Sequence, residues 1–236
     1  MFGASKRRQK ACIGVFMKRG KNCKVYRGAV LFPNVVLGDK VTVFPGAVIG
    51  RPPLSTGATR LGVTWDSLPP VKIGNNCVIG ANAVIYADVE IGDNSMVCDT
   101  ACIREQCRIG SFCVIAQGVT INYNTKIGNH VRVMDNSHLT GNMVIEDKVF
   151  IGMLVTTAND NLMGRQKESY QPRGPIIRKF ATIGQGSCIL PEVEIGENAI
   201  VGSNAVVTKD VAPRTVVMGT PARFVRDVKP EEIMNE

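Results

Sequence analysis

The sequence predicts an all-β solenoid built from short parallel strands. Between Ile73 and Thr156, fourteen consecutive groups of six residues each open on isoleucine, valine or leucine. The fifth position of these hexads is nearly always small, and Gly, Asp and Asn crowd the second to fourth positions. A period of six fits neither a helix nor the simple alternation of a sheet with one wet face. It fits a solenoid in which each hexad is one short strand and one turn.

The first and fifth positions of the hexads form the predicted core. Three hexads would close one triangular coil, and each inward side chain would stack on the same position of the neighbouring coils. Burying one isoleucine, valine or leucine contributes roughly 1.5–3 kcal/mol, whereas ordering one residue costs about 1–2 kcal/mol. These terms nearly cancel in one coil, so only a stack of coils is stable.

Residues 1–24 are predicted to form a basic N-terminal arm. Nine of the 28 Lys and Arg residues lie within residues 1–27, which contain no Asp or Glu. The arm is either a solvated extension or a segment that binds anions such as nucleotide phosphates, acidic lipid or nucleic acid. Its apolar run at 11–17 is too short to span a membrane and has no cleavage site after it. We therefore expect a cytoplasmic location.

The hexads predict a solenoid over 25–215 with two excursion loops. Segment 51–72 contains two Pro-Pro pairs and the only Trp, which indicate a loop rather than a strand. Segment 157–182 also leaves the repeat, because the 32 residues from Ile151 to Ile183 are not divisible by six. Polar loops of this length inside a compact domain are usually functional or disordered. We expect the second excursion to serve function.

The tail at 216–236 is predicted to end in a short helix. Pro230 precedes two acidic residues, and proline is typical of the first position of a helix. Such a helix would cap the open edge of the last coil.

The eight cysteines are interpreted as reduced thiols that pack in the core. No C-x-x-C spacing is present, and the chain contains only two histidines, so we predict no metal site. Four cysteines fall on the fifth position, where a small apolar residue is needed, namely Cys23, Cys77, Cys107 and Cys113.

The repeat resembles that of the hexapeptide-repeat acyltransferases. The resemblance implies a left-handed parallel β-helix, a homotrimer, and acetyl-CoA as co-substrate. The ending from Ala199 to Val211, followed by 217–223, is similar to the coil that holds coenzyme A in that family. The resemblance places four residues along the cofactor groove, namely Ala205, Lys209, Pro221 and Arg223.

A narrower resemblance links residues 145–223 to N-acetyltransferases that act on amino groups of UDP- or dTDP-linked sugars. It rests on Phe150-Ile-Gly, Thr156-Thr-Ala-Asn, Tyr170-Gln-Pro and 176–184. The first excursion resembles instead a loop of lipid A acyltransferases. The resemblance implies a role in lipopolysaccharide or polysaccharide biosynthesis. The candidate substrate-binding residues are Trp65, Asp160, Tyr170 and Arg178.

Three polar residues are the candidate catalytic groups. Acetyl transfer to an amine needs a place for the proton and a donor for the oxyanion. His138 lies at the sixth position of its hexad, on the predicted outer face near the second excursion, and resembles the histidine base of sugar O-acetyltransferases. In N-acetyltransferases that lack this base, the departing thiolate takes the proton. Asn136 and Asn159 would then orient the amine or stabilise the oxyanion.

Three functions therefore stay open. The first is an acetyl-CoA-dependent N-acetyltransferase for a nucleotide-linked amino sugar, with its active site between the subunits of a trimer. The second is an O-acyltransferase that uses His138 as general base. The third is a non-catalytic scaffold. The enzyme hypotheses imply neither a nucleic-acid partner nor a membrane span.

Overall fold

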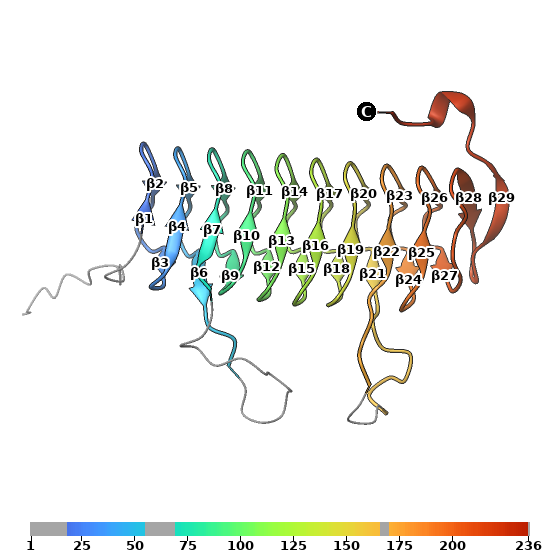
Figure 1. Cartoon of the computed structure of the whole chain (residues 1–236), viewed down its shortest axis with the longest axis horizontal. Coiled ribbons are helices and arrows are strands. Elements are labelled where there is room, and N and C mark those ends of the chain that lie inside the picture. Colours follow the sequence, from blue (N-terminus) through green and yellow to red (C-terminus); the bar gives the residue numbers. More distant parts are fainter. Residues whose placement is uncertain (1–17, 55–68, 166–169, 236) are drawn as a thin grey trace, which may run out of the picture.

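The protein is a triangular prism whose faces are three parallel sheets of very short strands (Figure 1). The computed structural model describes residues 18–54, 69–165 and 170–235. Successive strands pass from sheet A to sheet B to sheet C, so each coil adds one strand to every sheet. Paired residues on neighbouring coils, such as Thr120 and His138, are 18 residues apart, which is three hexads. The predicted left-handed parallel β-helix is confirmed.

Each strand holds between two and five residues. In spatial order, sheet A contains β1 (Lys18–Arg19), β4 (Val35–Leu37), β7 (Val71–Ile73), β10 (Glu90–Ile91), β13 (Arg108–Ile109), β16 (Lys126–Ile127), β19 (Val144–Ile145), β22 (Ile176–Ile177) and β25 (Glu194–Ile195). Sheet B contains β2 (Lys24–Val25), β5 (Thr42–Val43), β8 (Val78–Ile79), β11 (Met96–Val97), β14 (Val114–Ile115), β17 (Arg132–Val133), β20 (Phe150–Ile151), β23 (Thr182–Ile183), β26 (Ile200–Val201), β28 (Thr215–Met218) and β29 (Arg223–Asp227). Sheet C contains β3 (Val30–Leu31), β6 (Val48–Arg51), β9 (Val84–Tyr86), β12 (Cys102–Ile103), β15 (Thr120–Ile121), β18 (His138–Leu139), β21 (Thr156–Thr157), β24 (Cys188–Ile189) and β27 (Val206–Val207).

The core is the predicted ladder of first and fifth hexad positions. Position-one residues such as Ile103 and Ile121 are fully buried. At the fifth position the small polar side chains form hydrogen bonds with backbone carbonyls of the next coil. For example, Sγ of Cys107 donates to the carbonyl of Asn122 at 3.1 Å. Burial raises the pKa of the Cys107 thiol to about 12. All seven cysteines in the described part of the chain are unpaired. The four at the fifth position are buried packing thiols, as predicted, whereas Cys98, Cys102 and Cys188 are only half-buried and do not belong to the core.

The corners of the prism place the fourth residue of the hexad in the left-handed region. Asn76 and Asn94, with φ of 56° and 57°, are typical, because asparagine tolerates this conformation best among residues with a side chain. Phe112 and His130 occupy the same corner position on the next two coils, and their rings stack with centroids 4.9 Å apart. His130 is therefore an exposed turn residue.

The solenoid begins earlier than the predicted Val25. Strand β1 already pairs in parallel with β4, although Arg19 stands where an aliphatic residue was expected. Arg19 is tolerated there because its side chain is exposed in the terminal coil. Residues 1–17 of the predicted basic arm lie outside the described residues.

The second excursion is shorter than the predicted 157–182. Thr157 still fills the core position of its coil, with only 6% of its surface exposed. Strand β22 rejoins sheet A at Ile176, and Ile177 restores the spacing of six to Ile183. The loop outside the solenoid is therefore 158–175.

Both excursions leave the same edge of the prism. The chain passes from β6 to β7 and from β21 to β22, each time from sheet C to sheet A. Figure 1 shows the described ends of both loops emerging from this one edge. The outer face of sheet C between them is thus bordered by a loop at each end.

The C-terminal tail closes the last coil with a hairpin rather than with the predicted helix. Strand β28 pairs with β26, and β29 returns antiparallel to β28. The helix is a single 3-10 turn, η2 (Pro230–Glu232), that follows the hairpin. The backbone N–H of Met234 donates to the side chain of Asn198 at 2.8 Å and ties the tail to the solenoid.

Candidate active site on the outer face of sheet C

The outer face of sheet C presents a ladder of polar and thiol side chains. Cys102, Thr120, His138, Thr156 and Cys188 stand on successive coils and are aligned by strand pairing. These residues point outward because the residue that follows each of them occupies the buried first position of the next hexad. The face therefore carries one imidazole between two hydroxyls.

His138 is fixed by a hydrogen bond to the neighbouring coil. Its Nδ1 lies 2.7 Å from Oγ1 of Thr120. When Nδ1 carries the hydrogen and donates to Thr120, Nε2 keeps its lone pair for a substrate. Burial lowers the pKa of His138 below its usual value, so the imidazole is neutral at pH 7. A neutral, oriented imidazole is suited to act as a general base.

The base of the second excursion is fastened to the strand of His138. Oγ1 of Thr157 accepts from the N–H of Thr140 at 2.8 Å and donates to the carbonyl of His138 at 3.2 Å. Two residues further along the chain, Nδ2 of Asn159 donates to the carbonyl of Gly141 at 3.2 Å. A side chain at position 141 would lie within 2.9 Å of the Tyr123 ring, so this close approach requires glycine.

Asp160 shapes the first turn of the loop. Its Oδ1 accepts the N–H of Leu162 at 2.7 Å, and its Oδ2 accepts the N–H of Gly164 at 2.8 Å. These bonds are those of an Asx-type turn. The predicted substrate-binding carboxylate is thus engaged in holding the loop.

Tyr170 closes the two arms of the loop on each other. Its hydroxyl donates to the carbonyl of Asn159 and accepts the N–H of Asn161, at 3.5 and 3.4 Å. The side chain is half-buried at the root of the loop. The structure therefore brings Tyr170 and Asn159 together through the backbone of Asn159.

Two other predicted residues lie away from this cluster. Asn136 is an exposed left-handed corner residue, with φ of 57°, where the chain enters sheet C rather than where the loop leaves it. Arg178 follows β22 on the corner between sheets A and B and is held by ion pairs to Glu146 and Glu194, both at 2.8 Å. Trp65 lies outside the described residues.

A second hollow lies at the C-terminal end of the prism, between the last coil and the hairpin. It has a volume of about 400 Å³, and Lys209, Arg223 and Phe224 line it. The structure thus brings together the two predicted cationic ligands of coenzyme A. The side chain of Ala205 is fully buried in the core and does not reach this hollow, and Pro221 is exposed in the hairpin turn.

His138 lies within reach of this hollow along sheet C. Strands β21 and β24 separate β18 from β27, so the two places are three coils apart. At about 4.8 Å per coil this is about 14 Å.

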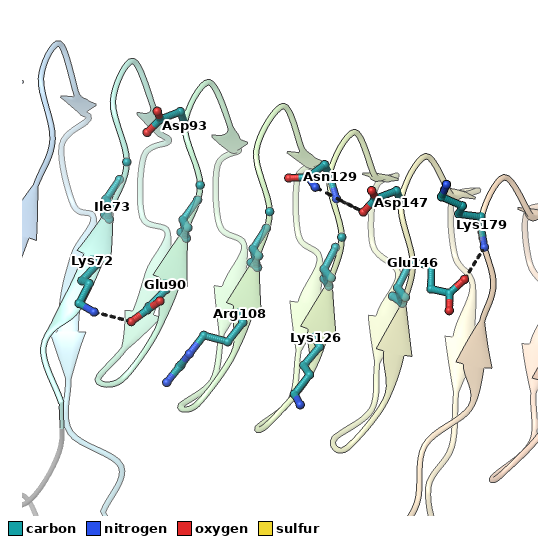
Figure 2. A pocket seen from close by; sticks show the side chains of 18 residues that line it. Lys72, Ile73, Glu90, Asp93, Arg108, Lys126, Asn129, Glu146, Asp147 and Lys179 are labelled. Atoms are coloured by element: carbon teal, nitrogen blue, oxygen red, sulfur yellow. Dashed lines mark hydrogen bonds and ion pairs between the residues drawn. The ribbon is translucent and has the colours of Figure 1, made fainter. Parts of the chain in front are cut away.

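A shallow groove of about 880 Å³ follows sheet A (Figure 2). None of its lining residues, all within the described part of the chain, is histidine or cysteine. Lys72 pairs with Glu90 at 2.7 Å, Asp147 accepts the N–H of Asn129 at 2.7 Å, and Glu146 accepts the N–H of Lys179 at 3.0 Å. The groove therefore offers no imidazole or thiol, and the carboxylates of Glu90, Asp147 and Glu146 are engaged in these contacts, so we place the candidate site on sheet C.

Within 18–54, 69–165 and 170–235, no three His, Cys, Asp or Glu side chains are grouped as metal ligands. None of the helices in these ranges has the length and apolar character needed to cross a bilayer.

Two family models match the chain. The model described as the GMPPB C-terminal domain matches residues 67–169. The model described as bacterial transferase hexapeptide, with six repeats, matches residues 174–209. Together they cover most of the β-helix.

Curated relatives match little more than a third of this chain. A candidate serine acetyltransferase of Schizosaccharomyces pombe is 42% identical over 85 residues, which are 36% of this chain and 29% of that protein. The serine acetyltransferase of Buchnera aphidicola subsp. Schizaphis graminum is 36% identical over 97 residues, which are 39% of this chain and 35% of the relative. The chain thus spans about a third of the length of these relatives.

Solved structures share the fold over nearly the whole chain. The UDP-N-acetylglucosamine acyltransferase of Arabidopsis has a TM-score of 0.66 and 16% identity, and the match covers 93% of this chain and 73% of that one. The UDP-N-acetylglucosamine O-acyltransferase of Moraxella catarrhalis has a TM-score of 0.55 and 21% identity, over 88% and 76% of the two chains. At these identities the similarity is one of fold.

Proposed function

The chain belongs to the hexapeptide-repeat acyltransferases, and from that premise we propose that it transfers an acetyl group from acetyl-CoA to the amino group of a nucleotide-linked sugar. The observation that carries the proposal is the place of His138. It stands on the outer face of sheet C, oriented by Thr120, on the coil next to the one from which the second excursion leaves and three coils from β27, which borders the hollow at Lys209 and Arg223.

In the proposed reaction, the neutral amine attacks the carbonyl carbon of the thioester. A carbon–nitrogen bond forms, the carbon–sulfur bond breaks, and coenzyme A leaves as a thiolate. Nε2 of His138 takes the proton that the amine loses and passes it to the thiolate. Thr120 holds the ring and stabilises the imidazolium that exists between the two proton transfers.

Asn159 is the proposed donor for the oxyanion. Its Nδ2 donates one hydrogen bond to the carbonyl of Gly141 and carries a second N–H. The contacts of Asp160 and Tyr170 hold the root of the loop around Asn159, which supports a preorganised donor. In this proposal Asp160 and Tyr170 position the substrate through the shape of the loop.

Lys209 and Arg223 are the proposed ligands for the phosphates of coenzyme A, because charge-assisted hydrogen bonds to phosphate are the strongest that these side chains form. The pantetheine arm would follow sheet C toward His138, with Ala205 and Pro221 contributing only backbone. We propose a homotrimer in which a neighbouring copy covers this face. The mechanism requires no metal.

A second candidate is acetyl transfer to a hydroxyl group. The lowered pKa of His138 and its hydrogen bond to Thr120 favour this candidate, since a hydroxyl needs a neutral general base more than an amine does. The relatives named as serine acetyltransferases point the same way. Here the hydroxyl oxygen attacks, and the proton follows the same path.

The test is steady-state release of thiol from acetyl-CoA. The acceptors are UDP- and dTDP-linked 3-amino and 4-amino sugars, the same sugars with hydroxyl groups, and L-serine. Turnover confined to amino sugars supports the proposal, and turnover confined to hydroxyl acceptors establishes the second candidate. Silence with every acceptor, together with no thermal shift by acetyl-CoA, would leave a non-catalytic scaffold.

A further inference from the structure

We propose that Arg51 and Arg104, stacked on either side of Tyr86, bind the diphosphate group of the acceptor nucleotide. The guanidinium carbons lie 5.0 and 4.9 Å from the centre of the Tyr86 ring. Strand β9, which ends at Tyr86, lies between β6 and β12 in sheet C, so one arginine approaches from each side. We name these three residues the Arg51 cluster. The inference rests on the proposed function, since it concerns the acceptor of that reaction.

A break in the repeat places Arg51 in the cluster. The pairing of β6 with β9 shifts between Ile49 and Arg51, so Arg51 rather than Gly50 stands opposite Tyr86. Gly50 is buried in a left-handed conformation, with φ of 86°, and its position leaves little room for a side chain beside Phe32 and Val35. A bulge of this kind re-aims a side chain and often lies next to an active site.

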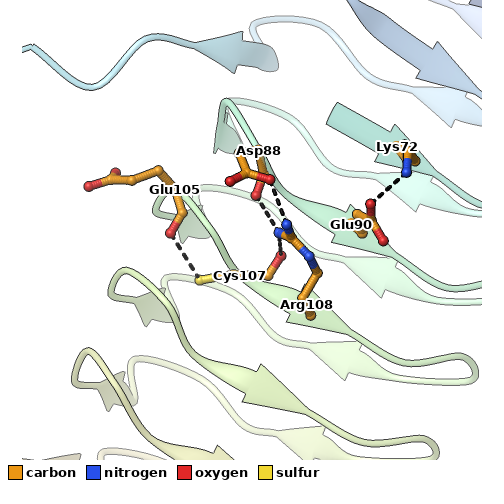
Figure 3. Close-up of polar contacts among 6 residues, drawn as sticks. All are labelled: Lys72, Asp88, Glu90, Glu105, Cys107 and Arg108. Atoms are coloured by element: carbon orange, nitrogen blue, oxygen red, sulfur yellow. Dashed lines mark hydrogen bonds and ion pairs between the residues drawn. The ribbon is translucent and has the colours of Figure 1, made fainter. Parts of the chain in front are cut away.

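Arg51 is the cation of this corner that lacks an acidic partner within the described residues. Arg104 forms two hydrogen bonds of 2.8 Å with Glu105, which is almost fully buried. Arg108 is paired with the buried Asp88 at 2.6 Å (Figure 3). Figure 3 also shows that the carboxylate of Glu105 points away from Arg108. Arg51 is exposed and its recorded side-chain contact is the Tyr86 ring, which leaves its fork of donors for an anion.

The cluster faces the same side of the prism as His138. Burial raises the pKa of the Cys102 thiol, and the positive charges of Arg104 and Arg51 partly oppose that rise, as expected if both lie over the outer face of sheet C. From Cys102 the ladder continues through Thr120 to His138, two coils away. This is about 10 Å. A sugar ring attached to a diphosphate at the Arg51 cluster would extend along the ladder toward the imidazole.

The two cationic places of the molecule lie on opposite sides of His138. Lys209 and Arg223 lie beyond β21 and β24, toward the C-terminus, and the Arg51 cluster lies beyond β15, toward the N-terminus. Coenzyme A and the acceptor nucleotide both carry a diphosphate, so either molecule offers the chemistry that Arg51 would recognise. The arrangement assigns coenzyme A to the first place and the acceptor to the second, with the reacting atoms between them.

The first experiment measures binding of inorganic pyrophosphate and of UDP by calorimetry, without any acyl donor. Arg51→Gln is expected to weaken both by about tenfold to a hundredfold, as for the loss of charge-assisted hydrogen bonds. The affinity of Arg51→Lys should lie between those of the unmodified protein and Arg51→Gln, because lysine keeps the positive charge but lacks the planar fork of donors of a guanidinium. The matched control is Lys126→Gln, which removes an exposed cation on the outer face of sheet A and should change neither affinity.

The assignment is overturned if Arg51→Gln binds both ligands as Lys126→Gln does. It is also overturned if Arg223→Gln weakens UDP binding and Arg51→Gln does not, because the diphosphate would then occupy the coenzyme A site. In kinetics, Arg51→Gln should raise KM for the acceptor at least tenfold and leave KM for acetyl-CoA within twofold. Because the binding arm needs no turnover, it decides the inference even if the proposed acetyl transfer fails.

Discussion

The hydroxyl of Thr120 lies 2.7 Å from Nδ1 of His138, on the neighbouring coil of sheet C. The contact is a direct product of the repeat, since residues 18 apart share one position on successive coils. It fixes the orientation of the imidazole ring through Nδ1, so that Nδ1 rather than Nε2 is engaged by Thr120. The structure thus couples the regularity of the solenoid to the orientation of the proposed base.

Replacing Thr120 by valine removes this hydrogen bond and keeps the shape of the side chain. We expect kcat to fall about fivefold to tenfold, since a neutral hydrogen bond contributes about 1 kcal/mol. Thr156→Val is the control, because Thr156 flanks His138 on the other side and, among the described residues, its side chain forms no hydrogen bond with His138. Equal rates for the two variants would show that Thr120 does not orient the base. Steady-state thiol release measures both.

The pKa of His138 should lie below 6.5, because burial disfavours the imidazolium. The unfolded chain then takes up a proton first as the pH falls. The contribution of His138 to stability is therefore complete above about pH 6.5 and is lost as the pH falls toward the folded pKa. NMR titration of the imidazole protons checks the shift. A midpoint at or above 6.5 would contradict it.

The two histidines of the chain are readily separated in this titration. In His130→Asn only His138 remains, and asparagine suits the left-handed corner that His130 occupies. If protonation of His138 stops the reaction, the acidic limb of the kcat profile should show the same midpoint as the NMR signal.

Arg178→Ala should leave KM for the acceptor within twofold. Arg178 is engaged by Glu146 and Glu194 on the corner between sheets A and B, away from His138. Because all three side chains are partly exposed, the loss should lower the free energy of unfolding by no more than about 1 kcal/mol. Urea denaturation measures this. A tenfold rise in KM would restore Arg178 as a substrate ligand.

Lys209→Ala and Arg223→Ala should each raise KM for acetyl-CoA about tenfold, because each removes one charge-assisted contact with phosphate. KM for the acceptor should not change in either variant. Lys126→Ala again provides the control for loss of one exposed cation. If all three variants behave alike, the hollow at the end of the prism does not hold coenzyme A.

The sequence predicted the solenoid because nearly every hexad carries an aliphatic residue at its first position. Ile121 and Leu139 are buried at the first position of hexads on consecutive coils of sheet C. Thr120 and His138 precede them directly, so their outward position follows from the repeat of six. The departure of the second excursion was placed at 157 because Thr157 is polar, although it fills a core position. Its return was placed too late because the prediction took Ile183 as the first residue of the resumed repeat, although Ile177 lies six residues before it and is buried.

The Arg51 cluster was missed for a different reason. Arg51 stands opposite Tyr86 only because of the bulge at Gly50. Counting in sixes places Gly50, not Arg51, opposite Tyr86. Tyr86 at the second position of its hexad, where glycine is frequent, was the available signal. Likewise, the engagement of Arg178 depends on Glu146 and Glu194 in two other coils, which only the stacked structure brings together.

The most direct test of the account compares thiol release from acetyl-CoA in His138→Gln and His130→Gln, with the acceptor that turns over best. General base catalysis at His138 predicts a fall in kcat of at least about a hundredfold for the first variant. His130→Gln should stay within a few-fold of the unmodified protein, because His130 is an exposed corner residue. Full activity in His138→Gln would contradict the proposal that His138 on sheet C is the general base. The departing thiolate would then be the group that accepts the proton.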